Sequence, residues 1–201
     1  MIKYRYLFIL LIGLLSTGCS RLPMLGQIAP LPAGPICRVA VLPFLNESDY
    51  PLGDAIVTKV FAAQFQDAGN HMVIHGGDIF KVYQQLHILP GERPSSDQLL
   101  IITDRVKAQL LITGRILEMQ EDRGFADTVN PFLFVEIQIF DGSSIERLWT
   151  TLHQRHGTDY HKVMHFGTIQ TVTGLSKQMV KEIINLWFTK GLKQCDVSLQ
   201  F

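Results

Sequence analysis

The chain has 201 residues, and its 18 lysines and arginines are balanced by 18 aspartates and glutamates. This balance excludes a protein that binds nucleic acid through its charge, because such proteins need a basic excess to release counterions. Hydrophobic residues make up 47% of the sequence, with no internal repeat, so the length suits one domain with its own core.

Residues 1–18 have the three parts of an export signal. Lys3 and Arg5 precede an apolar run from Leu7 to Leu15, which is shorter than the roughly 20 residues of a membrane-spanning helix. The small residues before Cys19 resemble the lipobox of bacterial lipoproteins, although Ser16 stands where that motif usually has leucine. The resemblance implies cleavage before Cys19 and acylation of that cysteine, with palmitate among the usual chains. An ordinary secreted protein with a chance cysteine is the alternative.

Residues 19–36 form a predicted lipidated tether, since prolines and glycines recur there without an apolar period. At about 3.3 Å per residue, such a tether reaches at most about 56 Å. The two remaining cysteines, Cys37 and Cys195, lie near the ends of the predicted domain, residues 37–201. An exported protein favours a disulfide between them, and two buried free thiols are the alternative.

The first half of the domain alternates short apolar runs with helical periods. The β-branched run after Cys37 is typical of a strand buried on both faces, and Gly69-Asn70 is typical of a helix end. Strands are predicted at 38–44 and 72–75, and helices at 53–69, 78–86 and 96–108.

The second half is dominated by strands. Asp141-Gly142 is a hairpin signal between two alternating segments, and the polar segment 118–130 is predicted to be a mobile connection. Strands are predicted at 109–118, 132–140 and 146–155, and a closing helix at 168–190. This order predicts an α/β (α+β) fold, a mixed sheet of about five strands with helices packed on it.

Three segments carry a resemblance to known families. They are Val39-Ala-Val-Leu-Pro-Phe-Leu-Asn46, the helix start Leu52-Gly53-Asp54, and Ala108-Gln-Leu-Leu-Ile-Thr-Gly-Arg115. Together they resemble the periplasmic domain of the TolB amino-terminal, CsgG-like and LpoB-like families, although Ala108-Gln109 replaces the usual Ala-Asp. The resemblance implies a TolB amino-terminal-like domain without enzymatic activity or cofactor.

The function expected from this resemblance is a scaffold or docking component of a cell-envelope assembly or secretion complex. In a Gram-negative host the protein would be anchored in the outer membrane and face the periplasm, where it could form a homo-oligomer. A regulator of a peptidoglycan synthase is the first alternative, although a short tether argues against it. A metal-binding or enzymatic periplasmic protein is the second. Pore formation is disfavoured, because the strands lack an extended lipid-facing alternation.

Few side chains suggest chemistry. His153, His156, His161 and His165 lie close in sequence, but His153 and His156 should point to opposite faces of a strand, which argues against a shared metal. No catalytic residue is predicted. Aromatic and apolar residues that flank the two long connections are candidate partner-binding residues, with peripheral core packing as the alternative. They are Phe125, Phe132, Tyr160, Met164 and Phe166.

Overall fold

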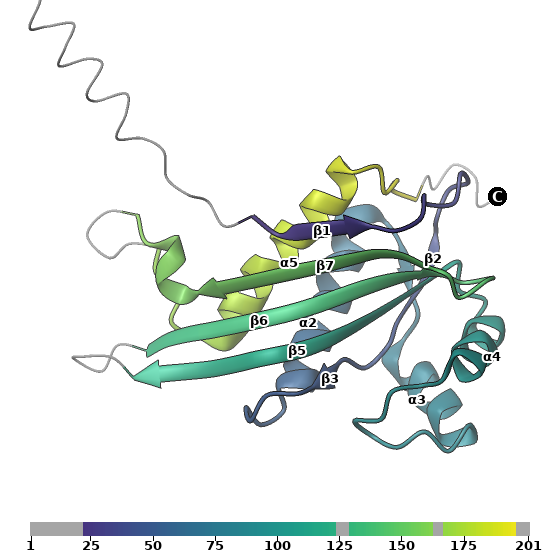
Figure 1. Ribbon diagram of the computed structural model, residues 1–201, viewed down its shortest axis with the longest axis horizontal. Coiled ribbons are helices and arrows are strands. Elements are labelled where there is room, and N and C mark those ends of the chain that lie inside the picture. The colour runs from purple at the N-terminus through teal and green to yellow at the C-terminus, as the bar shows by residue number, and fades with distance from the viewer. Residues whose placement is uncertain (1–21, 124–128, 163–166, 196–201) are drawn as a thin grey trace, which may run out of the picture.

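The computed structural model describes residues 22–123, 129–162 and 167–195. These residues form one mixed sheet of seven strands with helices against it (Figure 1). The predicted signal peptide and Cys19 lie outside the described residues. The elements in chain order are β1 (Met24–Gln27), β2 (Arg38–Val41), β3 (Leu45–Asn46), α2 (Gly53–Gly69), β4 (Met72–Val73), α3 (Gly76–Gln85), α4 (Ser96–Val106), β5 (Leu110–Arg123), β6 (Val129–Asp141), β7 (Arg147–His156), the 3-10 helix η2 (Gly157–Tyr160) and α5 (Val172–Thr189).

The strand order is β1-β7-β6-β5-β2-β4, with β3 also paired to β5. The pairings β2–β4, β2–β5 and β3–β5 are parallel, whereas the pairings β5–β6, β6–β7 and β1–β7 are antiparallel. The mixed sheet with packed helices confirms the predicted fold class. The sheet exceeds the expected five strands because β1 and β3 add to it.

Helices α2 and α5 cover one face of the sheet (Figure 1). The alternation of each strand sends every second side chain into this layer, where the largest group of buried residues lies. Trp187 of α5 contacts Phe61 of α2 at a ring-centroid distance of 5.7 Å, and its indole N–H donates to Thr151 Oγ1 on β7 at 2.8 Å. The sheet contributes mainly aliphatic side chains, among them Val39, Ile112, Ile137 and Ile139.

The other face is only partly covered. Helices α3 and α4 pack on it beside β2 and the start of β5, around a second core that includes Leu42, Tyr83 and Ile102. Ser95 and Gln98 form a reciprocal capping box that starts α4. In the described part of the chain no helix covers this face over β6, β7 and β1 (Figure 1). We call this part the open face.

The predicted tether is wrong in its extent. Met24–Gln27 pairs with β7 as an edge strand, and Ala29 and Ile36 are buried. The backbone N–H groups of Ile28 and Ala29 both donate to the Leu148 carbonyl. The pairing partner is more than 100 residues away in sequence, so a four-residue strand between prolines had no local signal.

The predicted mobile connection at 118–130 is also wrong over most of its length. Strand β5 continues to Arg123, and β6 already begins at Val129. Polar side chains such as Glu118 and Gln120 are exposed on this extension, and their backbones pair with Phe134 and Phe132. The segment was polar because it lies at a solvated end of the sheet.

A disulfide joins Cys37 and Cys195, with a Cα–Cα distance of 4.8 Å across a separation of 158 residues. It links the segment before β2 to the segment after α5. The Cys195 N–H also donates to the Gly69 carbonyl at 2.9 Å. The disulfide confirms the bridge that the cysteine count predicted, and the hydrogen bond places it beside the end of α2.

None of the helices within the described ranges combines the length and the apolar character needed to cross a membrane.

Candidate functional site

A pocket of about 200 Å³ lies where α4 and the loop before it meet the sheet. Its floor is made by side chains of β5 and β6. Its walls are largely apolar, and Arg93 and Pro94 of the α3–α4 loop lie at its rim. Apolar lining residues include Leu42, Tyr83, Leu99, Phe140 and Ile145.

The floor residues project together because of the β5–β6 register. Thr113 lies opposite Gln138, and Arg115 lies opposite Glu136, so all four side chains leave the same face of the sheet. The intervening pair, Gly114 and Ile137, belongs to the other face. On that face the Phe44 ring fills the space that a side chain at position 114 would need, because a Cβ on Gly114 would lie 2.5 Å from a ring atom of Phe44. The polar floor is thus a consequence of ordinary strand alternation.

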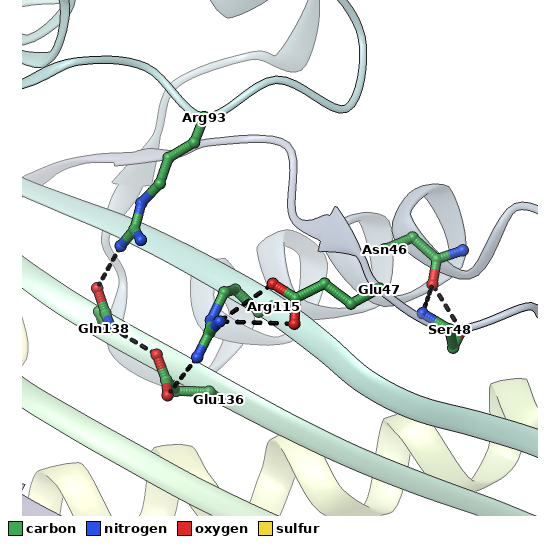
Figure 2. Close-up of polar contacts among 7 residues, drawn as sticks. All are labelled: Asn46, Glu47, Ser48, Arg93, Arg115, Glu136 and Gln138. Atoms are coloured by element: carbon green, nitrogen blue, oxygen red, sulfur yellow. Dashed lines mark hydrogen bonds and ion pairs between the residues drawn. The ribbon is translucent and has the colours of Figure 1, made fainter.

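Arg115 is the centre of an ionic network that crosses three segments (Figure 2). Its guanidinium donates to Glu136 on β6 at 3.0 Å and to Glu47, which follows β3, at 3.1 Å. The hydrogen bond to Glu136 raises the pKa of Arg115 above its ordinary value although burial opposes it, so Arg115 stays a cation. Two carboxylates compensate this cation.

Arg93 extends the network toward the rim. Its guanidinium donates to Gln138 Oε1 at 3.4 Å, and the Gln138 amide in turn donates to Glu136 (Figure 2). In the part of the chain that the structure describes, Arg93 has no ion pair. It is exposed and remains available to an acidic group of a partner.

The size of this pocket limits what it can hold. Small-molecule sites usually measure about 300–1,000 Å³. A volume near 200 Å³ suits one side chain or a short segment of a partner protein. Apolar walls beside an unpaired cation would favour an apolar side chain next to a carboxylate. Sequence reasoning missed this site, because Arg115 and Glu136 meet only through the register.

Only two of the five predicted partner-binding residues lie in the described part of the chain, and the structure does not bring them together. Phe132 is on the open face, where the centroid of its ring lies 4.4 Å from the ring centroid of His156. Tyr160 is on the opposite face and packs against the main core. Phe125, Met164 and Phe166 lie outside the described residues. Partner binding by these residues stays a prediction.

His153 and His156 lie on opposite faces of the sheet, as the alternation of a strand predicted. His153 points toward α5, whereas His156 contacts the Phe132 ring at a tilted angle on the open face. His165 lies outside the described residues. Within the described ranges, no three His, Cys, Asp or Glu side chains are placed to share a metal ion.

His153 instead belongs to a buried ionic cluster between β7 and α5. His153 Nε2 lies 2.6 Å from Glu182 Oε2, and Arg155 Nη2 lies 3.3 Å from the same oxygen. The Arg155 guanidinium carbon lies 5.4 Å from the centroid of the Tyr160 ring. Burial alone would raise the pKa of Glu182, but the hydrogen bond from His153 and the charge of Arg155 outweigh it and hold the pKa below its ordinary value.

We expect Glu182→Ala to lower the free energy of unfolding by about 3 kcal/mol, because it leaves the buried Arg155 without its carboxylate. A carboxyl group whose pKa is lower in the folded protein than in the unfolded chain stabilises the fold at any pH above its unfolded-state pKa. This stabilisation is lost as the pH falls through the folded-state pKa. The difference between wild type and Glu182→Ala should therefore shrink below about pH 4.5. Denaturant unfolding at pH 7, 5 and 3 measures it. Exposed Glu146→Gln is the control, and an equal loss at every pH would contradict the prediction.

No protein-family model matches this chain, and no curated protein matches it. Solved structures do share its fold. A PelC dodecamer from Paraburkholderia phytofirmans aligns at 15% identity over 81% of this chain and 95% of that chain, with a TM-score of 0.56. Lipoprotein GNA1162 from Neisseria meningitidis aligns at 15% identity over 76% of this chain and 99% of its own, with a TM-score of 0.52. The LpoB C-terminal domain from Salmonella enterica aligns at 14% identity over 62% of this chain and 87% of that domain, with a TM-score of 0.48.

The first two likenesses define the class of the domain. It is a mixed-sheet α+β domain with the fold of PelC and of the lipoprotein GNA1162. The fold expected from the resemblance in the sequence is thereby confirmed. Identities this low show a shared fold, and they carry no statement about partners or activity.

Proposed function

We propose that the protein is a lipoprotein, anchored through Cys19, whose periplasmic domain docks a partner protein in a cell-envelope complex without catalysing a reaction. The observation that carries the docking role is the pocket beside α4. It combines apolar walls, a floor on which Arg115 and Glu136 form an ion pair, and Arg93 at its rim, which has no ion pair among the described residues. Such a combination suits recognition of a protein segment.

The neutralised floor supports binding rather than acid–base chemistry. Arg115 is held between Glu136 and Glu47, so its charge is already compensated. Arg115 and Glu136 line the pocket as an ion pair, and Glu47 is not among the lining residues, so a partner in the pocket would cover a paired charge and not a lone one. Arg93 would then supply the specific contact, and loss of its charge should weaken binding.

The anchor is supported by the sequence before the first described residue. Cys19 follows an export-type signal, and β1 begins five residues after it, at Met24. The domain would thus stay much closer to the membrane than the tether of about 56 Å predicted from sequence allowed. A short connection suits a partner in or near the membrane. It disfavours a peptidoglycan synthase that must be reached across the cell wall.

Self-assembly is part of the proposal. PelC, which shares the fold, forms a dodecamer. The open face over β6, where Phe132 is partly exposed, offers a surface on which copies of this chain could meet. We therefore propose that the partner complex includes further copies of the chain.

A photo-crosslinking residue at Ser96, which is exposed at the pocket, tests the docking role in cells. We expect one dominant crosslinked envelope protein, and Arg93→Glu should reduce its yield at least about tenfold, the size of effect seen when an interfacial charge is reversed. The control is the same residue at exposed Gln66 on α2, which should give no such product.

Three outcomes would change the proposal. Equal products at Ser96 and Gln66 would refute the pocket as the docking site. A product that contains only this chain would identify the pocket as a contact between copies. A single peptidoglycan synthase whose activity the purified protein stimulates would establish the regulator instead.

A further inference from the structure

The outward side chains of β1 and the residues before it are apolar. Leu22 is 70% exposed and Met24 is 66% exposed, whereas Pro23 is buried between them and Leu25 packs against the main core. This is the alternation of an edge strand with one buried side. The exposed side of such a strand normally carries polar or charged residues that prevent association. Here it carries large hydrophobic ones.

These side chains continue an apolar strip on the open face. Met24 lies opposite Leu152 of β7, and Phe134 of β6 lies one diagonal step beyond Leu152. Leu152 and Phe134 are both partly exposed. The strip therefore starts at the amino-terminal edge and runs inward across the sheet.

The position of this edge is constrained by the proposed lipid. Cys19 precedes Leu22 by three residues, so the two Cα atoms can be separated by at most about 10 Å. The headgroup layer on each side of a bilayer is itself about 5–8 Å thick. A lipid on Cys19 would thus hold Leu22 and Met24 at the membrane surface.

We propose that Leu22 and Met24 enter the interfacial layer of the membrane that holds the lipid, with Leu152 beside them. The inference rests on the proposed lipidation of Cys19 and adds an orientation to it. The lipid supplies attachment, and the apolar edge prevents the domain from rotating freely about it. Proteins that lie on a membrane surface bury apolar side chains in the boundary between the headgroups and the acyl chains, and Leu22 and Met24 would lie in this boundary.

This orientation has a consequence for the pocket. Strand β1 is at one edge of the sheet, while β2 and β4 form the other side, next to α3 and α4 (Figure 1). Three strands, β7, β6 and β5, separate β1 from β2. The pocket floor begins on β6, where Glu136 lies opposite Leu152, whereas its rim with Arg93 lies on the side of α4. A membrane-bound β1 edge therefore leaves the α4 side of the pocket facing away from the bilayer, where a periplasmic partner can reach it.

Fluorescence quenching by brominated lipids tests this inference with the processed, lipidated protein in vesicles. Both native tryptophans are buried, Trp149 with 1% exposure and Trp187 with none, so an added tryptophan reports its own surroundings. Met24→Trp places the probe on the edge. The matched control is Leu89→Trp, because Leu89 is 67% exposed in the loop after α3.

We expect bromine near the headgroup end of the acyl chains to remove about half of the emission of the tryptophan at position 24, since interfacial groups lie about 5–10 Å into the boundary layer. The tryptophan at position 89 should be unaffected. If the protein floats with the vesicles but position 24 is not quenched, the anchor stands and the membrane contact is refuted. If position 24 is instead shielded from aqueous acrylamide and crosslinks to a second copy, the edge is a contact between copies. If the protein carries no lipid and does not float, the proposed anchor itself fails.

Discussion

Replacing Cys19 with alanine is expected to move the protein almost completely from the membrane fraction to the soluble periplasmic fraction. The lipoproteins that the segment before Cys19 resembles carry two or three acyl chains on and beside the cysteine, whereas a single chain gives only marginal, reversible attachment. Leu22 and Met24 alone offer too little apolar surface to hold the domain at the membrane. Fractionation and metabolic labelling with palmitate measure the change.

The neighbouring Ser20→Ala variant is the control and should stay in the membrane fraction with its label, since the change leaves the thiol in place. Retention of Cys19→Ala at the membrane would show that another element anchors the protein. A wild-type protein that takes up no palmitate would support the ordinary secreted protein considered from the sequence.

Loss of the disulfide is expected to cost more stability than loss of any single surface contact. For a separation of 158 residues, the chain-entropy model gives about 5 kcal/mol, which is an upper figure. The double variant Cys37→Ser/Cys195→Ser should therefore unfold at a temperature lower by about 10–20 °C in a domain of this size. Calorimetry and denaturant unfolding at pH 7 check it.

The bridge is supported by contacts that should survive its removal. His71 Nδ1 lies 2.8 Å from the Ile36 carbonyl oxygen, and the His71 ring stacks on Phe65 at 4.7 Å. Burial lowers the pKa of His71, so this contact is made by a neutral ring at pH 7. We expect the double variant to remain folded at 25 °C.

Reduced wild-type protein is the internal control for the double variant, and the two should unfold alike. Two thiols that titrate in the denatured, unreduced protein would show that the cysteines are not bridged. Equal stability with and without the bridge would instead mean that the unfolded chain is already constrained near its ends.

The docking pocket illustrates what sequence reasoning could not reach. Arg115 and Glu136 each appeared as a polar residue in an alternating strand, which predicts only that they leave one face. Their pairing depends on a register shift in β5 between Ile116 and Glu118 and on a connection that follows Arg123. Neither feature has a signature in composition or periodicity. Arg93, in a loop, reaches Gln138 only because α3 and α4 pack on that side.

Local sequence determined most of the elements. The helical period that ends at Gly69-Asn70 predicted α2, and Asp141-Gly142 predicted the turn between β6 and β7. Strand alternation correctly separated His153 from His156. These features follow from periods of 3.6 and 2 residues and from turn chemistry, which depend on neighbours in the chain.

Only the tertiary structure decided which segments join the sheet and which face stays open. Met24–Gln27 is a strand because β7 offers a free edge, and without β7 its four residues could not form one. The open face exists because α2 and α5 occupy the opposite face while α3 and α4 cover just one end. Both outcomes depend on contacts between residues far apart in sequence, whose energies no local pattern contains.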